Sequence, residues 1–552
     1  MVSGPSSLSL RTHTCGELNV DHVGKWVTLC GWVQYLRQDL FVILRDFSGL
    51  TQILVPQEES ASKVKADLCD LTVESVIMVT GTVRKRPAGQ ENKMPTGEIE
   101  VLAENVEVFN VSKKLPFEIK EFVKKSESLR MQYRYLDLRS SRMQKNLRLR
   151  SQLVMKMREF LCNEHGFVDV ETPTLFKRTP GGAKEFVVPS REPGLFYSLP
   201  QSPQQFKQLL MVAGVDRYFQ IARCYRDEGS KPDRQPEFTQ VDIEMSFVDQ
   251  EGIRTLVESM LQHSWPAEKG SIQVPFQTMT YEEAMRDYGV DKPDTRFNMK
   301  LTDISDIFSS TQVEFLRSAL DQPEGSIQAI LVPCGALFTG RELESIKQTA
   351  KTQFGQRPLL GSLRLQCAEL LESHGRPVRD PLAFHFLWVV DFPLFLPKED
   401  EPQELESAHH PFTAPLPEDT ALLFTEPHKV RGQHYDLVLN GCEIGGGSIR
   451  IHRASEQLYV LKNILKEDPS QLTHLLEALD FGAPPHGGIA LGLDRLVSII
   501  VGAASIRDVI AFPKSFRGHD LMSRAPDTVS DKDLTPYHIY VKWPTKQGGE
   551  EK

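Results

Sequence analysis

Five residues along one predicted β-hairpin have side chains that a buried hairpin does not need for packing. Arg226 and Glu228 follow the first strand-like run, and Phe238, Asp242 and Glu244 lie along the second. Gly and Pro between the two runs predict a turn. A guanidinium binds phosphate bidentately, a ring stacks on a base, and carboxylates bind an ammonium. Because buried charges without ligands are costly, the hairpin predicts a site for ATP and an amino acid. A surface salt bridge over a core phenylalanine is the alternative.

A second candidate for phosphate binding is the glycine-rich segment 487–496, in which Arg495 follows Gly492 at the start of a predicted helix over residues 496–501. A fixed positive charge beside a helix N-terminus suits a triphosphate tail. The segment lacks the GxxxxGK[ST] pattern, so it is not a P-loop. Glycine-rich corners between a strand and a helix are also common without any ligand.

Two carboxylates with a metal-binding pattern come next. Asp436 and Glu443 are seven residues apart, and three glycines and Arg450 follow. Carboxylates on one β element can hold Mg²⁺ while phosphates and water complete its ligands. Arg450 could bind a substrate carboxylate. A hairpin with a flexible glycine turn is the alternative, although glycines inside a strand have no packing rationale.

Smaller polar groups complete the candidate site. Ser202, Gln204 and Lys207 place a hydroxyl, an amide and an ammonium within about one helical turn after prolines, which suits a small zwitterion. A helix N-cap explains Ser202 equally well. His409 and His410 could be metal ligands, but neighbours in an extended chain point to opposite faces, so one shared metal is disfavoured.

The composition indicates an ordinary multidomain protein. The 552 residues predict two to four domains, and 40% hydrophobic with 25% charged residues is typical of soluble proteins. Eight cysteines without a CxxC pair indicate reduced thiols and no zinc site. No run of about 18 apolar residues predicts a membrane span. The net charge of −10 means that any polyanion must meet a local patch.

One basic patch is visible in the sequence. Between residues 130 and 150 there are basic residues at 130, 134, 139, 142, 145, 148 and 150, against the single acid Asp137. A nucleic-acid surface and a solvated face with helix-end charges stay equally open.

The N-terminal part has the pattern of a small barrel. Strands are predicted over residues 27–33, 40–44, 52–55, 76–83 and 98–102, with a helical stretch over 60–71 after the third. This order is expected of an OB barrel, which commonly binds oligonucleotides. Residues 113–129 are predicted to be a linker.

Further along, apolar residues at helical spacing predict a helix over 142–165 closed by Gly166, and residues 167–173 predict a strand that ends at Pro173. The fold class is α+β. The predicted parts are a flexible N-terminus (1–12), an OB-fold domain (13–112), a hinge (113–141), a catalytic domain in two pieces (142–274 and 387–520), an inserted α/β domain (275–386) and a C-terminal extension (521–552).

Taken together, the motifs resemble the three signature motifs of class II aminoacyl-tRNA synthetases. These are the helix and strand ending at Pro173, the Arg226-Asp-Glu hairpin, and Gly492-Leu-Asp-Arg495. The OB domain resembles the aspartate, asparagine and lysine subgroup. The sequences of residues 199–211, 237–244 and 440–450 are similar to those of bacterial-type aspartyl-tRNA synthetases. The sequence of residues 177–186 is similar to that of the vertebrate mitochondrial branch. The family fold is an antiparallel sheet flanked by helices.

The resemblance implies a set of roles. The amino acid L-aspartate would be bound by Ser202, Gln204, Lys207, Arg226, Asp242, His409 and Arg450. ATP would be bound by Arg226, Asp227, Glu228, Gln235, Phe238, Glu443, Gly492, Leu493, Asp494 and Arg495, with Arg226, Arg495 and Glu443 as the catalytic groups. Mg²⁺ would be held by Asp436 and Glu443. The anticodon of tRNA(Asp) would be read by Arg37, Phe41 and Gln52.

The resemblance also predicts how aspartate is selected. Lys207 and Arg450 would face its side-chain carboxylate and would be left as unpaired buried cations opposite asparagine, a penalty on the order of 3–5 kcal/mol. A homodimer in the mitochondrial matrix, with no membrane association, is implied as well, although residues 1–12 carry too little basic charge to indicate a transit peptide.

Two departures from the family pattern stand out. Gly181 replaces an acid of the bacterial relatives, which predicts a changed aspartate affinity. The insertion at 275–386 is shorter than expected, with an abrupt join near residues 356–360 that suggests a splice or gene-model artefact. Rival functions are an enzyme that also charges tRNA(Asn), a non-catalytic RNA-binding paralogue, and an ammonia-ligating adenylating enzyme on the same fold.

Overall fold

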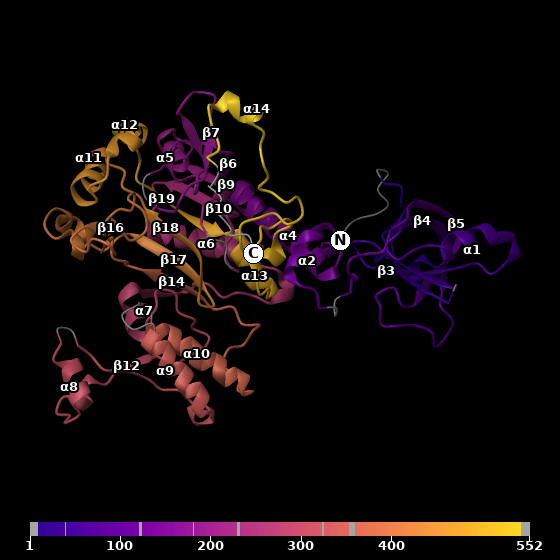
Figure 1. Ribbon diagram of the computed structural model, residues 1–552, viewed down its shortest axis with the longest axis horizontal. Helices are drawn as coiled ribbons and strands as arrows, with labels where there is room; N and C mark the ends of the chain where they lie inside the picture. The colour runs from indigo at the N-terminus through magenta and orange to yellow at the C-terminus, as the bar shows by residue number, and fades with distance from the viewer. Residues whose placement is uncertain are drawn as a thin grey trace, which may run out of the picture. The chain divides into compact units, whose positions relative to one another are not determined.

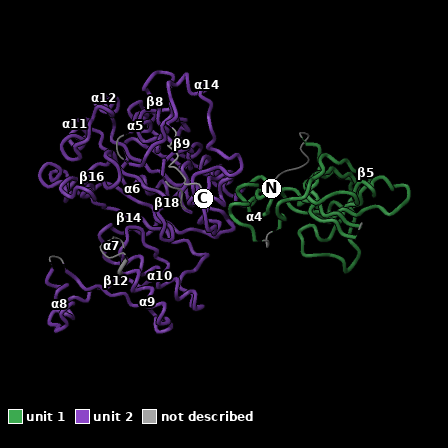
Figure 2. The backbone as a smooth tube through the Cα atoms, in the orientation of Figure 1, with its two compact units in different colours: residues 1–145 green, residues 146–552 purple. Residues whose placement is uncertain are grey.

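The computed structural model describes residues 9–38, 40–120, 124–179, 182–228, 232–322, 325–352 and 359–542. Gly181, the first eight residues and most of the join near residue 357 lie outside these ranges. The chain divides into two compact units, residues 1–145 and 146–552 (Figure 2), each with a hydrophobic core.

Unit 1 contains the predicted barrel. Its five strands close in the order β1-β2-β3-β5-β4, which confirms the OB fold. Leu29, Val42, Leu44, Ile53 and Val79 fill the interior because alternate residues of a strand face the same side. The elements are β1 (Trp26–Arg37), β2 (Phe41–Arg45), β3 (Leu50–Leu54), α1 (Ser62–Cys69), β4 (Val76–Lys85), β5 (Ile99–Asn110), α2 (Glu127–Gln132) and α3 (Arg134–Asp137).

Unit 2 is built on an eight-stranded sheet in the order β11-β14-β17-β18-β19-β10-β9-β6 (Figure 1). The six central strands pair antiparallel, as the class II resemblance implies. The two edge pairs, β11 with β14 and β6 with β9, are parallel. The strands are β6 (Val168–Asp169), β9 (Arg217–Tyr225), β10 (Glu237–Ser246), β11 (Gln277–Thr280), β14 (Phe386–Val390), β17 (His434–Leu439), β18 (Cys442–Ile449) and β19 (His486–Gly492).

The first signature motif has the predicted helix but a shorter strand than its pattern suggests. α4 (Ser141–Glu159) continues as a π-helical turn to Glu164, and Gly166 follows with φ 66°, which confirms the predicted helix and its stop. The strand predicted over 167–173 was too long: β6 has two residues. β6 pairs with β9 only through Val168 and Asp169.

Helices cover the large sheet. α5 (Gln204–Val212), α6 (Gln250–Ser264) and α13 (Leu493–Val501) contact its central strands, and α6 and α13 supply much of the main core. The other helices of unit 2 are α7 (Tyr281–Tyr288), α8 (Glu314–Leu320), α9 (Gly340–Thr352), α10 (Leu359–Ser373), α11 (Ala454–Tyr459), α12 (Thr473–Asp480) and α14 (Asp531–Leu534). Within the described ranges, no helix combines the length and apolarity needed to cross a bilayer.

The predicted insertion begins too early in the sequence. β11 lies past residue 275, yet it is an edge strand of the large sheet, paired with β14. α9 and α10 pack together beyond α7 on one side of unit 2, beside a small core around Phe297, Phe338 and Ala368, and α8 lies apart from this pair (Figure 1). Short hairpins complete the unit: β7 (Val187–Pro189) with β8 (Phe196–Ser198), β12 (Leu301–Asp303) with β13 (Gln328–Ile330), and β15 (Phe395–Pro397) with β16 (Leu405–Ser407).

Candidate active site

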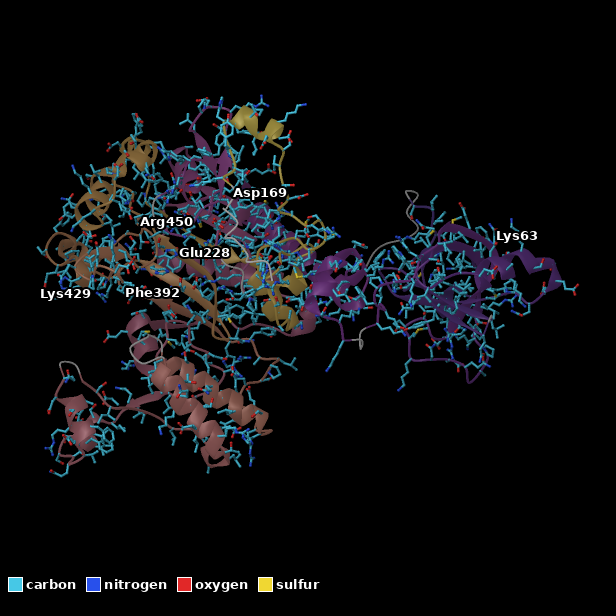
Figure 3. The ribbon with its side chains drawn as sticks, viewed as in Figure 1. Lys63, Asp169, Glu228, Phe392, Lys429 and Arg450 are labelled. Atoms are coloured by element: carbon cyan, nitrogen blue, oxygen red, sulfur yellow. The ribbon has the colours of Figure 1, made fainter. Side chains whose placement is uncertain are left out.

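One cavity of about 600 Å³ in unit 2 brings together residues from distant parts of the chain. Arg226 and Arg495 both line it, as the predicted ATP site requires. The other predicted residues that line it are Ser202, Gln204, Lys207, Glu228, Gln235, Phe238, Asp242, His409, Glu443, Arg450, Gly492 and Asp494. Figure 3 labels Arg450 and Glu228 in the central part of unit 2.

Two predicted ATP ligands do not direct their side chains into this cavity. Leu493 is 1% exposed and packs in the main hydrophobic core, because it lies on the inner face of the first turn of α13. Asp227 does not line the cavity, and its backbone N–H donates to the carbonyl of Lys184. Neither residue lines the cavity, and a role for them in ATP binding stays a prediction.

Four charged side chains form a buried cluster at the inner end of the cavity. Asp242 and Glu244 lie on the same face of β10, since they are two residues apart on one strand. Lys207 Nζ from α5 lies 3.1 Å from Asp242 Oδ1 and 3.5 Å from Glu244 Oε2. Arg450, just after β18, donates from Nε and Nη2 to the two oxygens of Glu244 at 3.0 and 3.1 Å. All four residues are at most 1% exposed.

This pairing corrects one prediction. Lys207 and Arg450 were expected to face the substrate as cations that only aspartate could pair. Instead both already bind carboxylates of the protein, because a buried charge without a partner costs several kcal/mol. Glu244, which the resemblance did not assign, is the residue that joins them. Its position two residues after Asp242 was the sequence signal.

The two carboxylates of the cluster differ in their environment. Burial raises the pKa of Asp242 despite the nearby charge of Lys207. Burial alone would also raise the pKa of Glu244, but Arg450 and Lys207 together hold it below its usual value. Asp242 Oδ2 is buried and has no hydrogen-bond partner among the described residues. This oxygen is an acceptor that a bound ammonium would satisfy.

The phosphate side of the cavity contains the two arginines. The guanidinium of Arg226 lies over the ring of Phe238, 5.0 Å from its centroid, and its buried Nε meets no hydrogen-bond partner in the described part of the chain. Arg495 donates from Nη1 to the carbonyl of Glu443 at 2.5 Å, and its Nη2 lies 3.4 Å from Asp233. Both guanidinium groups can therefore bind a phosphate without breaking a buried ion pair.

Two other predicted ATP ligands hold the walls of the cavity together. Asp494 binds Arg150 through one oxygen and accepts the N–H of Thr239 through the other at 2.9 Å, so it links α13, α4 and β10. Gln235 exchanges two hydrogen bonds with the backbone of Lys514, at 2.7 and 3.0 Å. Their side-chain contacts are structural, although both residues line the cavity.

The β17–β18 hairpin brings its two carboxylates together. Asp436 lies opposite Gly446 in the register, and a bulge follows Leu437. A Cβ added at Gly446 would lie 2.7 Å from Asp436 Oδ1 and 3.6 Å from Glu443 Oε1, so glycine leaves the space between them open. The charge of Asp436 and burial both raise the pKa of Glu443. Two facing carboxylates with open space fit a divalent cation.

Both histidines of the 405–413 segment line the cavity, contrary to the expectation that they point to opposite faces. Their ring centroids are 4.5 Å apart because the segment is not a regular strand. His410 Nε2 lies 2.6 Å from Arg450 Nη1. Burial and neighbouring positive or histidine groups hold the pKa of both far below the usual value.

The three residues predicted to read an anticodon lie on the barrel of unit 1. Arg37 and Phe41 face each other across the β1–β2 turn, and both are at least partly exposed. Gln52 on β3 is 8% exposed, and its amide donates to Glu100 Oε2 at 2.9 Å. Two of the three side chains are thus available on the surface, and the third is held by a neighbouring strand.

The basic run between residues 130 and 150 is largely structural. Arg130 and Arg134 both bind Asp137, and Arg139 binds Glu74 at 3.0 Å. Arg150 binds Asp494. At least four of the seven basic residues are thus paired within the fold, and a nucleic-acid surface on this segment stays a prediction.

Comparison with known proteins agrees with this geometry. The family model for class II tRNA synthetases (D, K and N) matches residues 126–516, and the model for the OB-fold nucleic acid binding domain matches residues 27–109. The mitochondrial aspartate–tRNA ligase of Homo sapiens is 62% identical over 598 aligned positions, covering 99% of this chain and 93% of that protein.

More distant relatives extend the comparison. The aspartate–tRNA(Asp/Asn) ligase of Opitutus terrae is 44% identical, covering 97% of this chain and 100% of that protein. The solved structure of asparaginyl-tRNA synthetase from Pyrococcus horikoshii with asparaginyl-adenylate shares the fold, with a TM-score of 0.61, 22% identity, and coverage of 93% of this chain and 99% of that one. By its family model and by its identity to these full-length relatives, the chain belongs to the class II tRNA synthetases of the D, K and N group.

Proposed function

We propose that this enzyme is an aspartate–tRNA ligase that activates L-aspartate with ATP and transfers it to the 3′ end of tRNA(Asp). The single observation that carries the proposal is the cavity in which Arg226 and Arg495 lie beside the Lys207–Asp242–Glu244–Arg450 cluster. The names of the relatives at 62% and 44% identity support aspartate as the amino acid.

In the first step the α-carboxylate of aspartate attacks the α-phosphorus of ATP, the bond to the β-phosphate oxygen breaks, and pyrophosphate leaves. Arg226 and Arg495 bind phosphate oxygens and offset their charge, and Phe238 provides a face for adenine. In the second step a ribose hydroxyl of the tRNA attacks the aspartyl carbonyl, and AMP leaves with the electron pair of the mixed anhydride. No side-chain nucleophile is required, so positioning provides much of the catalysis.

Asp436 and Glu443 would hold Mg²⁺, which when bound offsets phosphate charge. Their open space at Gly446 and the raised pKa of Glu443 support this assignment. The carboxylates would otherwise repel each other, so the pair itself favours a cation.

Selectivity for aspartate follows from the hydrogen-bond capacity of the cluster. Lys207 has three N–H donors and directs two toward Asp242 and Glu244. Arg450 has five and uses four, on Glu244, Ser448 and His410. Each cation keeps one donor for a substrate carboxylate oxygen, while Asp242 Oδ2 accepts the substrate ammonium. Asparagine offers an NH₂ where a second acceptor is required, which costs about 1–3 kcal/mol or more for a charged donor.

The test is ATP–pyrophosphate exchange with aspartate or asparagine, followed by aminoacylation of purified transcripts. We expect exchange with aspartate and very little with asparagine. Exchange that prefers asparagine would contradict the proposal, and no exchange would favour the non-catalytic paralogue.

A second candidate is an enzyme that charges both tRNA(Asp) and tRNA(Asn), because the relative from Opitutus terrae carries that name. Charging of the two transcripts side by side separates the candidates. The higher identity to the mitochondrial relatives favours tRNA(Asp) alone and a mitochondrial matrix location. Imaging of a tagged full chain tests the location, and light scattering tests the homodimer that the family resemblance implies.

A further inference from the structure

His434 lies beside the proposed metal ligands but has no role in the site described so far. It is the first residue of β17, two positions before Asp436, so both side chains lie on the same face of the strand. Its Nε2 lies 2.8 Å from Asp436 Oδ1. A carboxylate only accepts hydrogen bonds, so Nε2–H is the donor and the tautomer is set by this contact. His434 Nδ1 is buried and has no partner among the described residues.

The imidazole is also held between two rings. It stacks on Phe392 with centroids 4.3 Å apart and planes 29° apart, and on His409 at 4.3 Å and 20°. Two stacked rings at this distance cannot share one face of His434, so the imidazole lies between them. Phe392 is 5% exposed and is itself packed against Tyr281, which fixes the outer ring of the stack.

The stack reaches the substrate side of the cavity through His409. Its Nε2 would lie 3.6 Å from a Cβ at Gly446, the same point that lies 2.7 Å from Asp436 Oδ1. His409 is also in ring contact with His410, which contacts Arg450. The His434 imidazole thus connects Asp436 to His409. Through His410, this contact continues to Arg450 of the buried cluster.

We propose that His434 is a positioning residue with two separable roles, and this inference rests on the proposed function. Its Nε2–H fixes the Asp436 carboxylate through Oδ1, the oxygen that lies beside the space at Gly446. Its ring supports His409 over the cavity. A hydrogen bond from a neighbouring group orients a metal ligand in this way in many sites, and its loss typically lowers metal affinity about 10- to 100-fold.

Two substitutions separate the roles. His434→Phe keeps a ring between Phe392 and His409 but removes the N–H. His434→Gln keeps an amide N–H that can reach Asp436 but removes the ring. The first role, orientation of Asp436, is measured without turnover by titrating the full chain with Mn²⁺ in the presence of a non-hydrolysable ATP analogue. The electron paramagnetic resonance signal of free Mn²⁺ reports how much of the ion is bound. The KM for aspartate in pyrophosphate exchange measures the second.

We expect His434→Phe to raise the apparent Kd for Mn²⁺ by about tenfold or more with little change in the KM for aspartate. We expect His434→Gln to restore Mn²⁺ binding and to raise that KM. His428→Phe, the same change at an exposed histidine of η8 (Pro427–Lys429), is the matched control and should change neither value.

Wild-type Mn²⁺ affinity in His434→Phe would overturn the proposal, and so would equal weakening by both variants. Thermal melts show whether each variant is folded, and the Mn²⁺ titration of whichever variant folds still decides the first role. If the wild-type chain binds Mn²⁺ but does not charge tRNA with aspartate, the proposed function fails while the His434 result stands.

Discussion

The catalytic cavity of unit 2 and the barrel surface of unit 1 use polar residues in different ways. In the cavity, Lys207, Asp242, Glu244 and Arg450 are buried and bind one another. On the barrel, Arg37 at the end of β1 and Phe41 at the start of β2 remain accessible to solvent. A buried group depends on its partners for its charge and its energy, whereas an exposed group acts almost independently. Substitutions should therefore couple stability to activity in the cavity and separate the two on the barrel.

The largest expected effect is that of Lys207→Ala. It leaves Asp242 and Glu244 without one counter-charge, which costs about 3–5 kcal/mol for a buried pair. Both the melting temperature and aspartate-dependent pyrophosphate exchange should fall sharply. Lys429→Ala is the control, because Lys429 (labelled in Figure 3) pairs with Glu426 at the surface and its loss should change the melting temperature little. If both variants lowered the melting temperature and the exchange activity equally, the contrast between buried and exposed charges would be refuted.

Glu244→Gln should destabilise the protein in a pH-dependent way. The pKa of Glu244 is held below its usual value in the fold, so its contribution to the free energy of unfolding is complete above the unfolded pKa of about 4.3 and is lost as the pH falls through the folded pKa. The difference between wild type and variant in urea unfolding should be large at pH 7 and shrink below about pH 4.3. A difference that grows in acid would show that the carboxylate is not stabilised by its cations.

Arg226→Ala should reduce activity with little loss of stability, because its guanidinium has no ion pair with a described residue. Removal of one charge-stabilising donor typically costs about 10²–10³-fold in kcat. Arg223→Ala, on β9 three residues before Arg226 and paired with Glu237, is the matched control and should keep nearly full exchange activity. If Arg226→Ala lowers the melting temperature as much as Lys207→Ala does, Arg226 stabilises the fold as the buried cluster does, which contradicts this prediction.

Phe41→Ala tests the barrel. Loss of a stacked base costs about 1–3 kcal/mol, so the KM for tRNA should rise while pyrophosphate exchange stays unchanged. Gln52→Ala should instead lower barrel stability, since Glu100 then loses its amide donor. An exchange defect in Phe41→Ala would mean that the barrel surface does not act separately.

The predicted elements succeeded where the signal was local. The β9–β10 hairpin, the OB strand order and the helix that stops at Gly166 follow from alternation, turn residues and helical spacing. The strand before Pro173 and the start of the insertion were misplaced, because strand length and the membership of β11 depend on which neighbour completes the ladder. The motif that includes Leu493 gives residue identity but not the direction of each side chain, and the Leu493 side chain is buried.

By itself, the sequence determined which residue types were present and which local elements carry them: arginines beside turns, carboxylates two apart on a strand, glycines where a side chain would fill the site. The tertiary structure decided which charges neutralise which. Glu244 joins Lys207 to Arg450, Asp494 binds Arg150, and His434 orients Asp436. Such pairings depend on distances of about 3 Å between distant segments, where Coulomb energy is large, and no spacing along the chain encodes those distances.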